Sequence, residues 1–276
     1  MQYRAWQGRP IGLATSFENS TVPEASDFPL LFEPGDAWEY GVGIDWAGEM
    51  VSRVNGNMTL EEYLQKNVWG PLGMKDTTFH PASTPSVLDK LVDMSLRSGG
   101  ISPYGVAIDP NGKVEYSDDT VWNLETKDCH GGAGGYGSPL EFHKLLHSIC
   151  ANDGRILKSA TIDEMFKPQL TDAARASYQQ KTAIPFMNQA YGGIPLGIKA
   201  DWGLGGFINL EALPGRNAGS MAWGGHPNLR WCIDRVAGMS TMYGSQIQPT
   251  GDIITNKLVL AWAEEMYKRS GIKEKL

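Results

Sequence analysis

The chain has 276 residues, of which 41% are hydrophobic and 20% are charged, and its formal net charge is −7. These values are ordinary for a soluble globular enzyme of one or two domains, and they exclude an intrinsically disordered chain. An acidic chain without a run of basic residues is also poorly suited to bind nucleic acid.

The sequence shows no sign of secretion or of membrane insertion. Its N-terminal residues lack the apolar core of a signal peptide, and no window approaches 18 uninterrupted apolar residues. The chain has three cysteines, Cys129, Cys150 and Cys232. Their odd number and wide spacing do not suggest a set of disulfide bonds. We therefore expect a reducing compartment and a cytoplasmic location.

The first half of the chain predicts mainly helices. Residues 1–37 contain four prolines and no periodicity, which predicts coil. A helix is predicted after Pro34-Gly35 because apolar side chains recur on one helical face, at Ile44, Ala47, Val51 and Val54. Thr59-Leu-Glu-Glu62 is a capping box that predicts the start of the next helix. Residues 83–96 predict a weaker helix.

The middle of the chain alternates turns and helices. Residues 99–120 predict two short strands around a turn at Asp109–Gly112. Residues 131–137 form a glycine-rich loop, and amphipathic patterns predict helices at 139–151 and 159–167. Residues 170–200 have weaker patterns and predict a loop with short strands.

The last third predicts an antiparallel sheet closed by a helix. Short apolar runs separated by turn residues predict a meander of strands at 202–210, 220–225, 229–234 and 239–246. An amphipathic pattern predicts a terminal helix at 253–269.

Several common functional motifs are absent or out of context. The sequence has no phosphate-binding P-loop and no Gly-x-Ser-x-Gly elbow. The glycine-rich loop follows Asp128-Cys129-His130 and not an apolar strand, so we expect no dinucleotide cofactor. His143 and His147 have the i, i+4 spacing of metal ligands, but a third ligand is not evident. We interpret the pair as a solvated helix face and expect no metal.

An ordered set of motifs resembles the serine β-lactamase-related superfamily, which includes class C β-lactamases, family VIII carboxylesterases and fungal polyketide transesterases. The motifs span roughly residues 28–265. They are Phe32–Tyr40, Gly43–Gly48, Leu60–Leu64, Trp69–Phe79, the loop Gly131–Ser138, Trp223–Asp234 and Gln246–Asp252. The resemblance implies an α/β fold of the β-lactamase/transpeptidase type, with a helical subdomain, an antiparallel sheet and a C-terminal helix.

The resemblance makes Tyr40 the candidate catalytic tyrosine. A neighbouring lysine can lower the pKa of a phenol, which is ordinarily near 10, and let it act as a general base. Gly41 and Val42 stand where the family often has Ser and Asn, which favours ester or thioester substrates over β-lactams. The alternative is that Tyr40 is an aromatic residue packed beside a helix start. We interpret Asp45, in the first turn of that helix, as structural.

The resemblance also implies that Trp223-Gly224-Gly225-His226 is the strand along which the substrate binds. In the family, a backbone N–H just past this strand forms half of the oxyanion hole, which makes His226 the second candidate catalytic residue. The imidazole of His226 can also titrate near neutral pH. We expect Trp223, Gly224, Gly225 and Asn228 to bind substrate. The alternative for His226 is a hydrogen-bonded histidine at a strand end.

The family's Ser-x-x-Lys nucleophile motif lies upstream of its tyrosine, and residues 1–39 do not contain it. The one occurrence in this sequence is Ser270-Gly-Ile-Lys273, in the polar C-terminal tail. Three explanations stay open. The chain is a fragment, another chain contributes the nucleophile, or the cleft is reused without covalent chemistry. On this basis the fold is expected to lack its N-terminal strands and nucleophile helix.

These observations predict a helical subdomain at 1–170 and a sheet with a C-terminal helix at 171–276, with a cleft between them. The first functional hypothesis is an esterase or transesterase, acting on a small acyl or polyketide-like substrate in secondary metabolism. The second is a non-covalent cyclase, isomerase or lyase that uses Tyr40 and His226 as acid and base. The third is a catalytically inactive binding subunit. We also expect association with a second copy or with a complementing chain.

Overall fold

The computed structural model describes residues 20–27, 29–100, 109, 111–118, 124–191 and 194–271. The strand predicted between residues 99 and 108 lies largely outside the described residues. The chain forms two compact units. Unit 1 comprises residues 1–31, 40–92 and 119–141, and unit 2 comprises residues 32–39, 93–118 and 142–276. The division expected near residue 170 stays a prediction.

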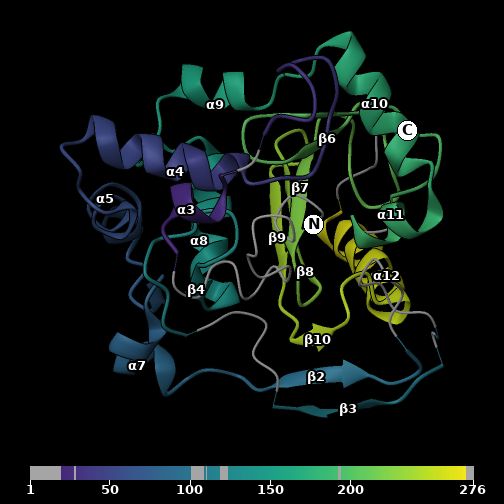
Figure 1. Cartoon of the computed structure of the whole chain (residues 1–276). Coiled ribbons are helices and arrows are strands. Elements are labelled where there is room, and N and C mark those ends of the chain that lie inside the picture. The colour runs from purple at the N-terminus through teal and green to yellow at the C-terminus, as the bar shows by residue number, and fades with distance from the viewer. Residues whose placement is uncertain are drawn as a thin grey trace. The chain divides into compact units, whose positions relative to one another are not determined.

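Unit 1 consists mainly of short helices (Figure 1). They are α3 (Val22–Ala25), α4 (Gly43–Val54), α5 (Leu60–Leu64), the π-helix η1 (Gln65–Trp69), α6 (Gly70–Leu72), the 3₁₀-helix η2 (Pro81–Ser83) and α7 (Pro85–Leu88). Strands β1 (Thr77–Thr78) and β4 (Tyr136–Gly137) pair antiparallel. Helix α3 lies where coil was predicted, and it begins at a capping box formed by Thr21 and Glu24.

The predicted helices α4 and α5 are confirmed. The capping box of α5 is formed by reciprocal bonds, from the Glu62 N–H to the Thr59 hydroxyl and from the Thr59 N–H to the Glu62 carboxylate. Helix α4 buries the face that carries Asp45 and Gly48, whereas Ile44 is 59% exposed. A Cβ on Gly48 would lie 2.7 Å from a methyl carbon of Leu60, so glycine allows close approach to α5.

The prediction of a helix at 83–96 is wrong beyond Leu88, where α7 ends. Strand β2 (Met94–Arg97) follows and pairs with β3 (Val114–Ser117) and β10 (Ile247–Gln248) in unit 2. The buried Arg97 guanidinium binds the carboxylate of Asp252 and donates to the carbonyl of Gly112 at 2.8 Å. Long-range pairing and this ion pair therefore override the local helical pattern.

The meander predicted for the last third is confirmed in a five-stranded antiparallel sheet (Figure 1). Its strands are β5 (Ala200–Trp202), β6 (Phe207–Asn209), β7 (Met221–Gly225), β8 (Leu229–Asp234) and β9 (Met239–Tyr243), in chain order. The single strand predicted at 202–210 is two strands joined by a turn. A Cβ on Gly203 would lie 2.2 Å from the carbonyl oxygen of Met165, so the turn requires glycine there.

The predicted helices α8 (Pro139–Ala151), α9 (Ser159–Met165) and α12 (Ile253–Ser270) are also confirmed. Apolar side chains of α8 and α9 form a core with β8 that contains Leu146, Ile149, Ile162 and Ile233. The prediction of a loop at 170–200 is wrong, because α10 (Asp172–Thr182) and α11 (Pro185–Ala190) lie there. Helix α10 is mostly polar and packs through few residues, chiefly Ala174 and Tyr178.

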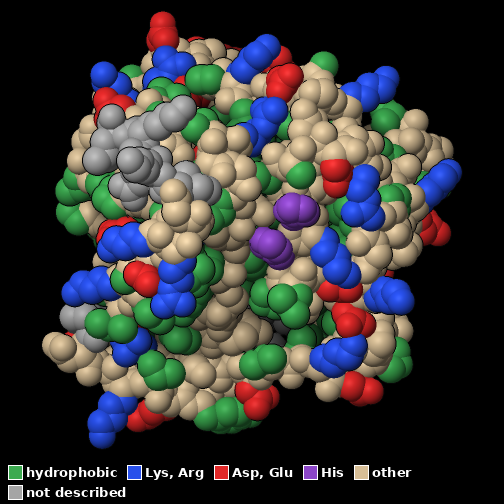
Figure 2. All heavy atoms as spheres, turned by 180° about the vertical axis from the view of Figure 1, so that it is seen from behind, with side chains coloured by type: hydrophobic (Ala, Val, Ile, Leu, Met, Phe, Trp, Pro, Cys, Tyr) green, Lys and Arg blue, Asp and Glu red, His purple; other side chains and the backbone are tan. Residues whose placement is uncertain are grey.

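No described helix combines the length and the apolar character that a membrane span requires. On the face drawn in Figure 2, Lys and Arg side chains lie among Asp and Glu side chains.

Candidate active-site residues

Tyr40 lies in the loop that precedes α4, and its side chain is 56% exposed. Partial burial of the phenol, followed by the nearby Asp45 carboxylate, raises its pKa above the ordinary value of 10.0. Among the described residues no lysine opposes this shift. The phenol is therefore protonated at neutral pH, and the described residues do not produce the lowered pKa expected for a general base.

Asp45 links the start of α4 to the glycine-rich loop. Its carboxylate accepts the Gly132 N–H at 3.0 Å and lies 3.9 Å from Nδ1 of His130. Burial raises the pKa of Asp45. A Cβ on Gly132 would lie 2.8 Å from a carboxylate oxygen of Asp45, so this loop position must be glycine for the contact to form. These contacts agree with the structural interpretation of Asp45.

The run Trp69–Phe79, which carries part of the family resemblance, also joins segments of unit 1. The carboxylate of Glu141 accepts the backbone N–H groups of Lys75 at 2.7 Å and Asp76 at 2.6 Å. Gly73 ends α6 in the left-handed conformation that glycine adopts without strain. The run thus fixes the chain between α6 and β1 against the start of α8.

Trp223, Gly224 and Gly225 form the second half of β7, opposite β8. A Cβ on Gly224 would lie 2.2 Å from the carbonyl oxygen of Leu229, so pairing with β8 itself requires glycine. Trp223 lies 4.7 Å from Trp202 between ring centroids and contacts an aromatic cluster of unit 2. The cluster contains Trp38, Tyr178, Tyr191 and Trp202, and the sequence analysis did not single it out.

His226 lies in the three-residue turn between β7 and β8, and its side chain is exposed. Its Nδ1 lies 2.8 Å from the hydroxyl of Thr250, and that hydroxyl donates to the carbonyl of His226 at 2.8 Å. Because the hydroxyl has one proton, we assign the proton of the neutral imidazole to Nδ1.

Asn228 ends the same turn with φ of 62° and has no solvent exposure. Its amide nitrogen donates to the carbonyls of Ile247 and Pro249, at 2.7 and 3.0 Å. Its amide oxygen accepts the N–H groups of Gly251 and Asp252, at 2.9 and 3.1 Å. These four bonds give Asn228 a structural role, and its contact with substrate stays a prediction.

Tyr40 belongs to unit 1, whereas Trp223, His226 and Asn228 belong to unit 2. The catalytic and substrate-binding assignments, and the cleft expected to bring these residues together, therefore stay predictions. His143 does not have the solvated environment expected for it, because its Nε2 lies 3.0 Å from the carbonyl oxygen of Ser240 on β9. His147 is exposed.

A comparison with models of protein families shows the family to which this chain belongs. The model of the Beta-lactamase family matches residues 11–261. This chain belongs to that family, and its fold is of the β-lactamase/transpeptidase type, as the motifs predicted.

The individual relatives are fungal acyltransferases and esterases. Monacolin J acid methylbutanoyltransferase from Aspergillus terreus is 35% identical over 244 residues, which cover 87% of this chain and 56% of the relative. Lovastatin esterase from Penicillium rubens is 37% identical over 215 residues, covering 78% of this chain and 51% of that protein. The solved LovD6 mutant of simvastatin synthase from Aspergillus terreus matches with a TM-score of 0.81 and 36% identity, covering 90% of this chain and 58% of that one. The chain thus spans little more than half the length of these relatives.

Proposed function

We propose that this chain contributes to an esterase or acyltransferase site that acts on an ester or thioester in secondary metabolism. The observation that carries the proposal is its similarity, over most of the chain, to proteins named as a methylbutanoyltransferase and an esterase. The β-lactamase family match, which covers both Tyr40 and the β7–β8 hairpin, adds to it.

In this proposal a serine hydroxyl attacks the acyl carbonyl, and the alcohol or thiol leaves with a proton. Water or an acceptor alcohol then attacks the acyl-serine ester and regenerates the serine. Tyr40 transfers the proton in both steps, and the N–H of His226 donates to the oxyanion.

The serine and lysine of this mechanism come from outside the 276 residues. The sequence has one Ser-x-x-Lys, at Ser270–Lys273, and the Ser270 hydroxyl donates to the carbonyl of Tyr267 at the end of α12. The raised pKa of Tyr40 agrees with a lysine that comes from elsewhere, because a lysine ammonium beside the phenol would lower the pKa of Tyr40.

For the substrate, we propose a small branched acyl group and a polyketide-like acceptor or ester. The support is the methylbutanoyl transfer in the relatives' names and the aromatic cluster beside Trp223, which offers apolar surface to such a molecule.

The test uses an acyl thioester, intact-mass measurement and release of free thiol. The chain alone should form no acyl adduct, because a serine without an adjacent base is a weak nucleophile. Mixed with a polypeptide that carries the family's Ser-x-x-Lys segment, it should release thiol and show the adduct on that segment's serine. A stoichiometric adduct on this chain alone, or no turnover in the mixture, would contradict the proposal.

The raised pKa of Tyr40 also favours a second candidate, in which the phenol is a general acid in a non-covalent isomerase, cyclase or lyase. That candidate requires turnover of a substrate by the chain alone, without an acyl adduct. A catalytically inactive binding subunit would bind a ligand without turnover. The mass measurement and the turnover assay therefore separate the three.

A further inference from the structure

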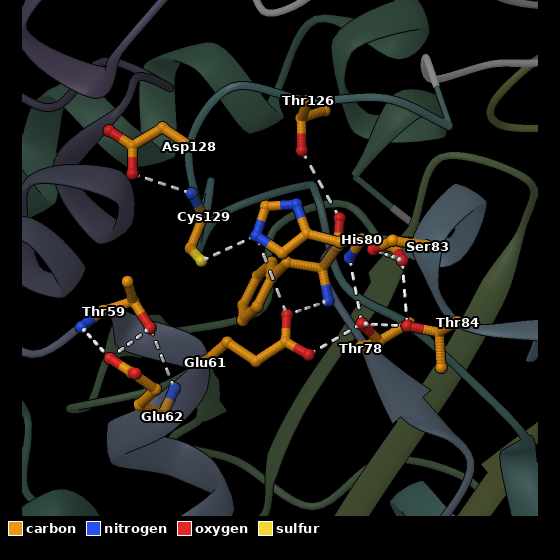
Figure 3. Close-up of polar contacts among 11 residues, drawn as sticks. Thr59, Glu61, Glu62, Thr78, His80, Ser83, Thr84, Thr126, Asp128 and Cys129 are labelled. Carbon is orange, nitrogen blue, oxygen red and sulfur yellow. Dashed lines mark hydrogen bonds and ion pairs between the residues drawn. The ribbon is translucent and has the colours of Figure 1, made fainter.

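Three side chains that commonly bind metals meet in unit 1, from three separate segments. Glu61 lies on α5, His80 follows β1, and Cys129 precedes the glycine-rich loop (Figure 3). Their ligand atoms all lie within 4.8 Å of one another. We propose that Glu61, His80 and Cys129 form a binding site for Zn²⁺, with water as the fourth ligand. This site is independent of the proposed acyl-transfer function.

The separation between the sulfur and nitrogen donors suits a tetrahedral ion. The Cys129 sulfur lies 3.5 Å from Nε2 of His80, and this nitrogen lies 3.8 Å from a carboxylate oxygen of Glu61. Zinc–sulfur and zinc–nitrogen bonds of about 2.3 and about 2.0 Å, at a tetrahedral angle, place sulfur and nitrogen about 3.5 Å apart. The thiol and the imidazole are thus at the distance that a shared zinc ion imposes.

Hydrogen bonds from neighbouring residues hold the carboxylate in place, as they do around many metal ligands. One oxygen of Glu61 accepts the Thr78 hydroxyl at 2.7 Å, and the other accepts the Phe79 N–H at 2.9 Å. The N–H of Cys129 donates to the side chain of Asp128 at 2.8 Å, which fixes the backbone that carries the thiol. Figure 3 shows these contacts around the three donors.

The surroundings of the thiol favour a cation. Burial, and then the charges of Glu61, Asp128 and Glu62, raise the pKa of Cys129 to about 11, against an opposing hydrogen bond from the Glu61 backbone. The same negative charges attract a divalent ion. Cys129 is 5% exposed, whereas the side chains of His80 and Glu61 are 35% and 27% exposed, which leaves a route for zinc and for its water.

Cobalt is the probe, because Co²⁺ occupies zinc sites and reports its ligands by absorption. The full chain, first treated with a chelator, should bind one Co²⁺ with a thiolate-to-cobalt charge-transfer band and the intense visible bands of a tetrahedral ion. One equivalent of Zn²⁺ should abolish both sets of bands. Cys129→Ser should lose the charge-transfer band, and His80→Gln should weaken binding at least tenfold.

Cys150→Ser is the matched control, because this thiol belongs to unit 2 and its pKa is likewise raised to about 11, chiefly by burial. It should bind Co²⁺ like the unsubstituted chain. Melting curves in chelator establish that each variant folds without metal, and Zn²⁺ should raise the melting temperature of the control but not of Cys129→Ser. Weak octahedral bands alone, or a charge-transfer band that survives in Cys129→Ser, would overturn the proposal.

Discussion

The hydroxyl of Tyr40 can be tested without changing its ring. Tyr40→Phe should reduce thiol release in the two-component assay by about 10²–10⁴-fold, because it removes a proton-transfer group. The free energy of unfolding should change by no more than about 1 kcal/mol, because the ring and its packing are kept and one hydrogen bond contributes about that much at most. Tyr116→Phe is the control, because Tyr116 is 71% exposed on β3. Equal rates for the two variants would give Tyr40 a packing role.

At Asn228, backbone strain and hydrogen bonding can be separated by two substitutions. Asn228→Gly keeps the left-handed conformation and loses four side-chain bonds, so it should destabilise the chain by roughly 2–4 kcal/mol. Asn228→Ala should cost about 1 kcal/mol more, because alanine is strained at positive φ. Urea unfolding measures both values.

The exposed Asn57 is a control for the strain, since its φ is 59°. Asn57→Ala should lower the free energy of unfolding by only about 1 kcal/mol. Equal stabilities of the Gly and Ala variants at residue 228 would disprove the strain component.

Strand β8 and helix α12 are joined by a buried carboxylate, which should make their packing sensitive to acid. Burial by itself would raise the pKa of Asp234, but bonds from Tyr267, Asn217 and Ala237 outweigh it and hold the pKa below 3.8. The folded state therefore favours the carboxylate. Its stabilising effect is complete above the ordinary pKa and is lost as the pH falls through the lower, folded value.

Asp234→Asn should reduce the free energy of unfolding by roughly 2–3 kcal/mol at pH 7. The difference from the unsubstituted chain should shrink below about pH 4, because the carboxyl of Asp234 is protonated first in the unfolded chain and, at lower pH, in the folded chain. Asp163→Asn is the control, because the Asp163 side chain is 56% exposed in its ion pair with Arg235 and should contribute little. A destabilisation by Asp234→Asn that is constant from pH 7 to pH 3 would contradict this account.

Elements with strong local signals could be predicted from the sequence. The capping box at Thr59 and the short apolar runs of β7, β8 and β9 predicted structure at nearly the observed bounds. Helix α10 was missed because its stability depends on packing of Tyr178 among distant aromatic residues, which leaves little local pattern. Strand β2 was mistaken for helix because its partners lie far along the chain.

The candidate site was predictable only in part. Tyr40 and the β7–β8 hairpin were proposed from motifs, because a family resemblance is carried by contiguous residues, and their roles in the site stay predictions. Glu61, His80 and Cys129 were not found, because they are separated in sequence and only folding brings their donor atoms together. The four bonds of Asn228 were missed for the same reason, since their partners lie at residues 247–252.

At the scale of the molecule, the five-stranded sheet ends in two edge strands within the part of the chain that the structure describes. In the described part of the chain, β5 and β9 are the outer strands of the five-stranded sheet. An unpaired strand edge is a site of association with other chains. We expect oligomers, or a complex with a complementing polypeptide, and sedimentation velocity across a range of concentrations measures this. A single monomeric species at all concentrations would contradict the expectation.

The two units interleave along the chain, and this affects how the protein is made. Each unit combines three separate stretches of sequence, and the chain crosses from one to the other after residues 31, 39, 92, 118 and 141. During synthesis on the ribosome, residues 32–39 must wait for residues 142–276 before unit 2 can close. Neither unit can therefore be expressed whole as one contiguous fragment, and a nick after residue 39, 92 or 118 would leave pieces from both units on each side.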